Sequence, residues 1–206
     1  MTIQSGIADG LQPLSRDALP DDTAELARFL IGKLVVRALP SGLAVGRIVE
    51  TEAYLTGDEA SHAFRGLTPR NRVMFGPKGY AYVYLIYGMY FALNVSGAAE
   101  GVGEAVLIRA AEPVAGLDAM TQHRGGVHER DLMRGPGRLA IALAIDRDLD
   151  GTDLCAPGPL WLACDGREPE GCGVSTRIGI SRDAHRPLRF FVKGSRYVSG
   201  PVSLNR

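Results

Sequence analysis

The sequence predicts a mixed α/β (α+β) protein, folded as a single domain around a mostly antiparallel sheet. Three observations predict it: two strand-like segments flank a Pro-Ser-Gly turn, a tyrosine-rich segment alternates with apolar residues as in a β-hairpin, and two separate regions have helical character. The 206 residues suffice for a substantial core and show no internal repeat or low-complexity linker. We therefore expect one domain over residues 1–206, with residues 1–15 as a flexible lead.

The first part of the chain predicts a helix followed by two paired strands. The helix is expected from Asp22 to Ile31, because Glu25 follows Asp22 at the spacing of a helix-capping pair. The segments 33–39 and 43–55 are rich in β-branched and apolar residues and are joined by the turn, which favours an antiparallel pair.

The remaining elements alternate between strands, helical pieces and loops. In order, we expect a loop with one or two short helical turns over 56–79, a hairpin over 80–94, a strand over 104–113 that Pro113 closes, two helical pieces within 114–145, a strand at 159–164, and two strands with a basic connection within 177–199.

Charge is segregated along the chain, although the formal net charge is zero. Residues 60–99 carry 4 basic and no acidic side chains, and residues 171–206 carry 7 basic and 1 acidic. The segments 1–59 and 100–170 are net acidic. A neutral total is therefore compatible with a basic face formed by the middle and the end of the chain.

The sequence lacks the usual signals for membranes, secretion and metals. No apolar run approaches the length of a membrane span, and the first ten residues have neither the basic nor the apolar region of a signal peptide. The 3 cysteines include no CxxC pair, and the 4 histidines show no metal-binding spacing. We expect a cytoplasmic protein, nucleoid-associated if bacterial, with no metal and no membrane attachment.

Tyrosines and cations are concentrated in one region. Five of the 7 tyrosines lie within residues 80–90, and the only charged side chains of residues 60–99 are Arg65, Arg70, Arg72 and Lys78. Aromatic residues among cations suit a surface that contacts a polyanion with stackable bases. A sheet whose tyrosines pack in the core, with their hydroxyls at its edge, explains the pattern equally well.

One strand carries an unusual polar face. In RIVETEAYL, the side chains of Glu50, Glu52 and Tyr54 share one face, because strand side chains alternate. A solvated outer face is the commonest explanation of such a pattern. The functional alternative is a carboxylate held beside an aromatic wall, available as a general base.

Four further side chains are candidates with open interpretations. His62 is either a surface or packing residue or a catalytic one, and Asn94 either forms a turn or lines a pocket. Arg109 lies in an apolar strand and needs a carboxylate or phosphate partner if it is buried. Arg138 follows a Gly-Pro-Gly sequence that suits either a phosphate site or a plain helix start.

Together, these segments resemble the alkyladenine (3-methyladenine) DNA glycosylase family. The resemblance covers roughly residues 24–199 and is carried by RIVETEAYL, DEASH, TPRNRVMF, YVYLIYGMYFALN, VLIRAAEP, GPGRLAIALAI and RPLRFFVKGS, in this order. It implies a curved sheet with helices at its back and a protruding hairpin in front. It also implies that Glu52 is the general base that activates water, that Arg109 holds this water and a neighbouring phosphate, and that the carbonyl of Ile180 helps to position the water.

The resemblance assigns the remaining candidates to the flipped base and to the DNA. Tyr54 on one side, with His62 and Tyr84 on the other, is expected to stack the base, and Asn94 to crowd the amino group of guanine. Tyr87 is expected at the hairpin tip, where it fills the gap in the DNA. Residues expected at the DNA backbone are Arg70, Arg72 and Arg138.

The implied activity is hydrolytic removal of alkylated or deaminated purines from double-stranded DNA by a monomer that needs water but no cofactor. A strand-cutting activity needs an amine nucleophile, and none of the 3 lysines lies in a pocket motif, so we expect a monofunctional enzyme. The first alternative is a silent damage- or RNA-binding module, against which Glu52 argues, because mere binding does not require a carboxylate. The second is a sugar hydrolase that uses Glu50 and Glu52, which their spacing does not reject but the basic tyrosine hairpin does. The segments 96–105 and 124–135 depart from the family pattern and leave the substrate preference open.

Overall fold

The computed structural model describes residues 10–86, 88–169 and 171–205, which form one mixed α+β domain. Its strands are β1 (Gln12–Pro13), β2 (Leu34–Leu39), β3 (Gly42–Tyr54), β4 (Ala81–Ile86), β5 (Tyr90–Ser96), β6 (Ala105–Ala115), β7 (Leu160–Cys164), β8 (Cys172–Ser175) and β9 (Arg189–Val192). Its helices are α2 (Thr23–Phe29), α3 (Leu117–His123) and α4 (Pro136–Ala142), with the 3-10 helices η1 (Arg16–Ala18), η2 (Arg72–Phe75), η3 (Glu129–Asp131), η4 (Arg147–Leu149) and η5 (Val202–Leu204). All strand pairs are antiparallel, so the predicted fold class is confirmed.

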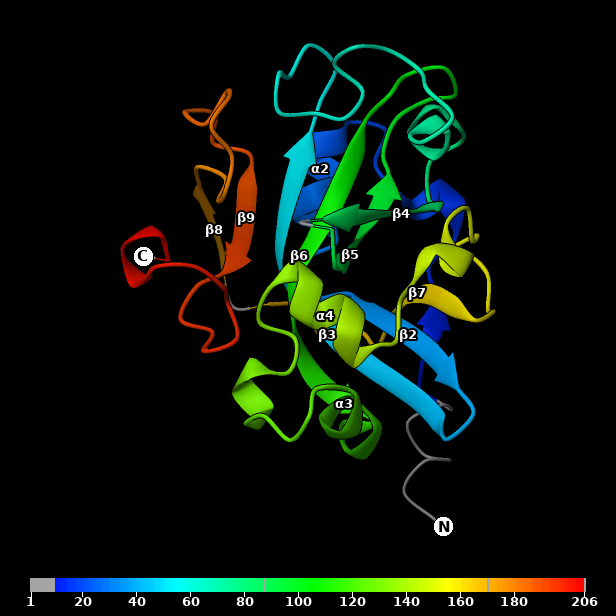
Figure 1. Cartoon of the computed structure of the whole chain (residues 1–206), viewed down its shortest axis with the longest axis vertical. Helices are drawn as coiled ribbons and strands as arrows, with labels where there is room; N and C mark the ends of the chain where they lie inside the picture. The colour runs from blue at the N-terminus through cyan, green and yellow to red at the C-terminus, as the bar shows by residue number, and fades with distance from the viewer. Residues whose placement is uncertain (1–9, 87, 170, 206) are drawn as a thin grey trace.

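The sheet is built around β3 (Figure 1). Along one edge β3 pairs with β6, and along the other it pairs first with β2 and then with β9. The strand order is β1-β7-β2-β3-β6-β5-β4, with β9 beside β3 and β8 beside β9. The second half of β3 is therefore enclosed by strands from the middle and the end of the chain.

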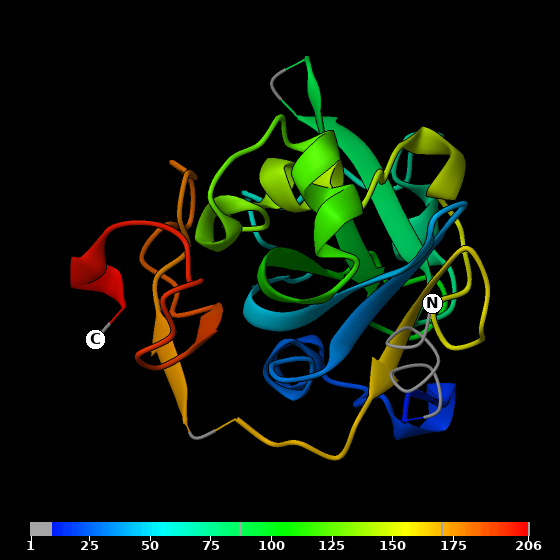
Figure 2. The same ribbon diagram turned by 90° about the horizontal axis from the view of Figure 1, so that it is seen from below.

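Helices cover both faces of the sheet, and not only its back as predicted. Figures 1 and 2 show α2 on one side of the sheet and α3 and α4 on the other. The burial pattern agrees, because residues 44–53 of β3 are all buried except Arg47. A strand with one solvated face would alternate, whereas a continuous buried run is covered on both faces. Among the described residues, no helix is long and apolar enough to cross a membrane.

Residues 12–14 of the expected flexible lead are more ordered than predicted. Gln12 and Pro13, within the expected lead, pair with β7, and Leu14 is buried. The predicted start of α2 is confirmed, since the Asp22 carboxylate accepts a hydrogen bond from the N–H of Glu25 at 2.8 Å. The helix ends at Phe29, two residues earlier than expected.

The predicted tyrosine hairpin is formed by β4 and β5. Its register runs from Ala81 opposite Val95 to Ile86 opposite Tyr90. Figure 2 shows the closed end of this hairpin projecting beyond the rest of the fold. Tyr87, the residue predicted at the tip, lies outside the described residues.

Two strand predictions were wrong in their limits. β6 continues through Pro113 to Ala115, and the missing N–H of Pro113 coincides with a register shift between Val45 and Gly46 on β3. The last hairpin pairs β9 with β8 at residues 172–175, ahead of the predicted segment. Gly173 packs directly against the Phe191 ring, and a larger side chain at this position of β8 would collide with that ring.

Candidate active site

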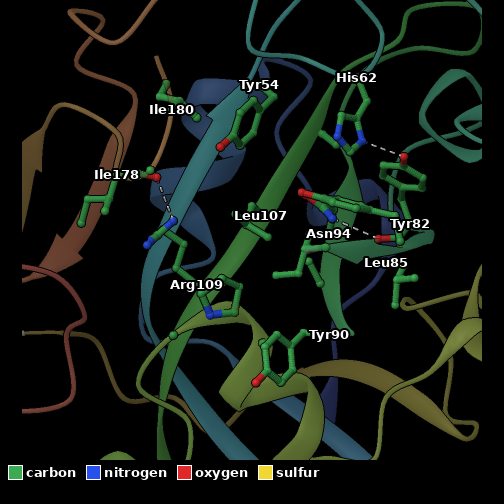
Figure 3. Close-up of a pocket in the computed structure, with 18 of the residues that line it drawn as sticks. Tyr54, His62, Tyr82, Leu85, Tyr90, Asn94, Leu107, Arg109, Ile178 and Ile180 are labelled. Carbon is green, nitrogen blue, oxygen red and sulfur yellow. Dashed lines mark hydrogen bonds between the residues drawn. The ribbon is translucent and has the colours of Figure 1, made fainter. Parts of the chain in front are cut away.

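A cavity of about 820 Å³ opens between the β4–β5 hairpin, α4 and the loop after β8 (Figure 3). Its lining includes Tyr54, His62, Tyr82, Tyr84, Tyr90, Asn94, Leu107, Arg109, Ile178 and Ile180. The structure thus brings together Tyr54, His62, Tyr84, Asn94 and Arg109, five residues that the sequence assigned to one site from four separate segments.

Glu52 lies immediately behind the wall of this cavity. Its carboxylate accepts hydrogen bonds from the N–H of Ile178 at 2.7 Å, the hydroxyl of Tyr54 at 2.9 Å and Nη1 of Arg109 at 3.2 Å. These three residues line the cavity, whereas the Glu52 side chain has no exposed surface. A reactant in the cavity therefore reaches Glu52 only where one of these contacts gives way.

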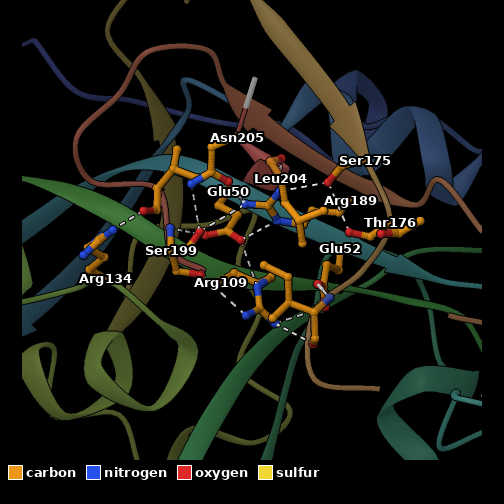
Figure 4. Close-up of polar contacts among 12 residues, drawn as sticks. Glu50, Glu52, Arg109, Arg134, Ser175, Thr176, Arg189, Ser199, Leu204 and Asn205 are labelled. Carbon is orange, nitrogen blue, oxygen red and sulfur yellow. Dashed lines mark hydrogen bonds and ion pairs between the residues drawn. The ribbon is translucent and has the colours of Figure 1, made fainter. Parts of the chain in front are cut away.

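Glu50 does not line the cavity, and its polar contacts differ from those of Glu52 (Figure 4). It accepts hydrogen bonds from Nε of Arg109 at 3.0 Å, Nε of Arg189 at 2.7 Å and the N–H of Ser199 at 2.7 Å. Both Glu50 and Glu52 are fully buried. The interpretation of this strand face as a solvated surface is therefore wrong.

The two glutamates differ in acidity. Burial raises the pKa of Glu52, and although Arg109, the Ile178 N–H and the Tyr54 hydroxyl oppose this, the pKa stays above its usual range. Burial also acts to raise the pKa of Glu50, but Arg109 and Arg189 overcome it and hold that pKa below its usual range. Two carboxyl groups whose pKa values are driven apart are candidates for different roles, and Glu52, with the raised pKa, is the candidate proton acceptor.

A β-bulge brings Arg109 to both carboxylates. On β6, Ala110 lies opposite Glu50 and Ile108 opposite Thr51, so Arg109 is an extra residue between two register positions. Bulges next to active sites commonly redirect a side chain in this way. The prediction that a buried Arg109 needs an anionic partner is confirmed, since it forms ion pairs with Glu50 and Glu52.

Three aromatic rings form the opposite wall. The ring centroids of Tyr82 and Tyr84 lie 5.2 Å apart, and those of His62 and Tyr84 lie 4.3 Å apart. A hydrogen bond of 2.9 Å joins Nδ1 of His62 to the Tyr82 hydroxyl. Burial raises the pKa of Tyr82 to about 12 and lowers the pKa of His62, so both are neutral at neutral pH. Both tyrosines line the cavity, and Tyr82 is also buried in a small apolar cluster against which Tyr84 packs, so the core interpretation holds for Tyr82.

Asn94 is fixed at the side of the cavity. Its Nδ2 donates a hydrogen bond to the carbonyl of Tyr82 at 3.1 Å. Its Oδ1 accepts no hydrogen bond from another described residue. Because the donor group is engaged, the side chain cannot turn freely. Asn94 thus presents a fixed polar edge to whatever occupies the cavity.

The three arginines predicted at the DNA backbone differ in where they lie relative to the cavity. Arg70 and Arg138 line it, together with Arg124, which sequence reasoning missed because no motif marks it. Arg72 is exposed on η2 and does not line the cavity. Tyr87 lies outside the described residues, so its predicted role is not tested.

The loop after β8 supplies contacts that the sequence did not reveal. Ile178, and not Ile180, contacts Glu52 and Arg109: its N–H donates to Glu52, and its carbonyl accepts from Arg109 Nη1 at 3.4 Å. This loop is held by Arg177, whose fully buried guanidinium forms an ion pair with Asp58 and lies 4.7 Å from the centroid of the Tyr54 ring. The sequence RIGI of this loop was predicted as part of a strand, because two of its four residues are isoleucine.

The cysteines and potential metal ligands are dispersed. Cys155, Cys164 and Cys172 are free. Within the described residues, no group of three or more His, Cys, Asp or Glu side chains could hold a metal ion.

Comparison with known proteins places this site in a family. Residues 17–196 match the family model described as methylpurine-DNA glycosylase. A relative from Mesorhizobium japonicum is 62% identical over 192 residues, with 93% of this chain and 92% of the relative covered. Relatives from Paraburkholderia phytofirmans and Methanoculleus marisnigri are 54% identical (93% and 90% covered) and 52% identical (86% and 94% covered).

All three relatives are provisionally named 3-methyladenine DNA glycosylase. The family model spans most of the chain, including β3, the tyrosine hairpin and the loop that carries Ile178. The resemblance stated from the sequence is thereby confirmed, together with the enzyme class, a DNA-repair hydrolase of N-glycosyl bonds. The chain belongs to the methylpurine-DNA glycosylase family.

Proposed function

We propose that this glycosylase extrudes alkylated or deaminated purines, such as 3-methyladenine and hypoxanthine, from duplex DNA and hydrolyses their N-glycosyl bond, leaving an abasic site. The proposal is carried by a fully buried Glu52 with a raised pKa, which lies beside Arg109 behind the wall of an aromatic cavity. A base within the duplex cannot reach such a cavity, so it has to leave the stack, at a cost of a few kcal/mol.

In the proposed mechanism, Glu52 is the general base. It takes a proton from the attacking water, and its negative charge stabilises the oxocarbenium-like sugar. Its Oε2 accepts from both Tyr54 and Arg109, so one of these contacts is released when water and substrate enter. Catalytic hydrogen bonds are commonly rearranged in this way between the free enzyme and its complex.

The cavity walls suit the substrate class. A cationic base such as 3-methyladenine is electron-poor, and it stacks favourably between tyrosine rings. Tyr54 on one side and Tyr84 with His62 on the other supply these surfaces. The neutral state of His62 avoids repulsion of a cationic base.

The two alternatives fit the geometry less well. A silent binding module gains nothing from a buried carboxylate of raised pKa close to a nucleic acid. A sugar hydrolase with two carboxyl groups needs both at the substrate. Glu50 is enclosed by Arg109, Arg189 and Ser199 and does not line the cavity.

Excision assays on defined lesions test the proposed function. Duplexes that each carry one lesion are incubated with the protein, and abasic sites are cleaved with alkali. We expect cleavage with at least one alkylated and one deaminated purine, and none with undamaged duplex. No cleavage of any alkylated or deaminated purine would contradict the proposal.

We propose in addition that the enzyme is monofunctional, is a monomer and acts in the cytoplasm at the DNA. No lysine lines the cavity in the described part of the chain, and two of the three lysines form ion pairs elsewhere: Lys33 with Glu168, and Lys78 with Asp21. Borohydride, which traps an imine between a lysine and an opened sugar, is therefore expected to leave no covalent complex with lesion DNA.

Excision is expected to decline with acid at a higher pH than an ordinary glutamate would give. The pKa of Glu52 is raised, so the ionised base is lost as the pH falls through this raised value. The measurement is kcat/KM for hypoxanthine-containing duplex against pH, with circular dichroism at each pH to confirm that the protein stays folded. An acid limb at or below the usual glutamate range would assign the base to another group.

Asn94→Ser is expected to increase removal of guanine-type bases by about ten-fold relative to hypoxanthine. This factor lies within the range by which enzymes discriminate between substrates that differ by one small group. Serine is shorter and lacks the amide edge that Asn94 presents to the cavity, so it leaves space for the amino group of guanine. Single-turnover rates on 7-methylguanine and hypoxanthine duplexes measure the change. An unchanged ratio would place the discrimination elsewhere.

A further inference from the structure

Arg109 is shared unequally between two carboxylates. Its Nε donates to Glu50 at 3.0 Å, whereas Glu52 receives only Nη1, at 3.2 Å. The other terminal nitrogen, Nη2, points to the Ser199 hydroxyl at 3.5 Å. A free guanidinium prefers to bind one carboxylate through two parallel hydrogen bonds. Arg109 makes no such pair with Glu52.

The position of Glu50 explains this geometry. Its carboxylate is fully buried and fixed by the Arg189 Nε and the Ser199 N–H, each at 2.7 Å (Figure 4). It occupies the Nε side of Arg109 and so prevents that edge of the guanidinium from turning towards Glu52. We propose that Glu50 is a positioning residue: it binds Nε of Arg109, so that this arginine contacts the catalytic Glu52 through Nη1 alone. Arg109 then does not form with Glu52 the two parallel hydrogen bonds that would compensate the charge of that carboxylate more fully.

Arg189 balances the charge of the buried cluster that it forms with Glu50, Glu52 and Arg109. Its guanidinium is fully buried and donates to Glu50, the Ser175 hydroxyl, the carbonyls of Ser199 and Leu204, and Oδ1 of Asn205. With both carboxylates ionised, Glu50, Glu52, Arg109 and Arg189 carry no net charge. Glu50 can therefore stay ionised next to Glu52, and the last residues of the chain close the cluster.

The groups that face Glu52 come from every neighbouring element. They are Glu50 and Tyr54 on β3, Arg109 on β6, the Ile178 N–H on the loop after β8, and Tyr84 on β4. Arg189 on β9 is the cross-strand partner of Glu52, and Arg177 lies against the ring of Tyr54. Glu50 is the only other carboxylate in this set. Removing its charge is therefore expected to make the arginines act more strongly on Glu52 and to lower the pKa of Glu52.

Glu50→Gln tests the inference, which rests on the proposed role of Glu52 as base. The amide keeps an acceptor for Arg109 Nε but loses the charge. The acid limb of kcat/KM is expected to move to lower pH by about one unit, the lower end of the shift that a nearby charge causes. The maximal rate should fall, because a weaker base accepts the proton less readily, while affinity for lesion duplex stays the same.

A carbon-13 titration of the Glu52 carboxyl by NMR gives a second readout that needs no catalysis. It is expected to show the same downward shift in Glu50→Gln. A wild-type protein that excises nothing would contradict the proposed function, and the titration would still decide the inference. A Glu52 carboxyl whose titration does not move, or moves upward, would overturn the positioning role even if excision is lost.

Two further variants separate positioning from folding. Glu50→Gln with Arg189→Gln removes one charge of each sign, so it keeps the buried charge balanced if the single variant does not fold. Its downward shift should be smaller than that of Glu50→Gln alone, because loss of the Arg189 charge acts to raise the pKa of Glu52. Asp165→Asn breaks a surface-proximal pair, in which Asp165 binds Arg47 at 2.6 Å away from the cavity. It should leave the acid limb in place. An equal shift in Asp165→Asn would reduce the effect of Glu50 to a general change in charge and would overturn the inference.

Discussion

Glu52→Gln is expected to slow excision by about 10²–10⁴-fold, the contribution of general acid–base catalysis by one positioned side chain. The substitution keeps the shape of Glu52 and an acceptor for the Ile178 N–H, but it removes the proton acceptor. Affinity for lesion duplex should persist, because the stacking rings and the basic residues of the cavity are unchanged. Single-turnover rates and gel-shift titrations with the same hypoxanthine duplex measure the two quantities.

Glu50→Gln is the matched comparison for this prediction, since it makes the same chemical change two residues away on the same strand face. It should retain measurable excision with a displaced acid limb, whereas Glu52→Gln should show no acid limb above background. An active Glu52→Gln beside an inactive Glu50→Gln would reverse the assignment of the base.

Asp58→Asn is expected to destabilise the fold by about 3 kcal/mol, the lower end of the cost of removing one partner from a buried ion pair. Asp58 and Arg177 are both fully buried, and a second hydrogen bond of 2.9 Å joins Arg177 Nη2 to Asp58 Oδ1. The amide still accepts one hydrogen bond but leaves the arginine charge uncompensated. Excision should fall as well, because Arg177 precedes Ile178, whose N–H holds Glu52. Urea unfolding measures the stability change.

The pH dependence gives an internal check on this prediction. Burial acts to raise the pKa of Asp58, but hydrogen bonds from Arg177 and the Ala60 N–H hold it below its usual range. The ion pair therefore stabilises the fold at neutral pH, and this contribution is lost as the pH falls through the lowered pKa. In Asp58→Asn, the stability of the fold should therefore decline less between neutral and acid pH than it does in the unmodified protein.

Asp165→Asn is the control, because the Arg47–Asp165 pair is partly exposed, at 14% and 22% of the side-chain surfaces. A pair of this kind is expected to contribute no more than about 1 kcal/mol. Equal losses of unfolding free energy in both variants would show that burial does not make the Asp58–Arg177 pair more important for stability than an exposed pair.

The local elements of the site could be predicted from the sequence. Alternation placed Glu50, Glu52 and Tyr54 on one strand face, and the structure keeps them there, with Tyr54 bonded to Glu52. The tyrosine hairpin was predicted because strand-forming residues flank a short glycine-containing turn. The helix start at Asp22 followed from a capping pattern that spans only a few residues. Each of these features depends on interactions within one segment.

Other features of the site had no local signal. The limit of β6 was misjudged because Pro113 normally ends a strand, whereas here a register shift accommodates it. The loop with Ile178 was predicted as a strand, since an apolar run does not show whether a paired edge is available to it.

The sequence by itself determined the residue types of the site, their spacing along each strand and the family to which the chain belongs. Only the tertiary structure decided that both glutamates are buried, that a bulge turns Arg109 towards them, and that the pKa values of the two carboxyls move in opposite directions. The physical reason is separation along the chain. Apart from Tyr54 and the other glutamate, the groups that shift the pKa values of Glu50 and Glu52 lie 57 to 149 residues away. They meet the two carboxyls only when β3 pairs with β6 and β9. Acidity depends on burial and on neighbouring charge, and both exist only after these distant segments have packed together.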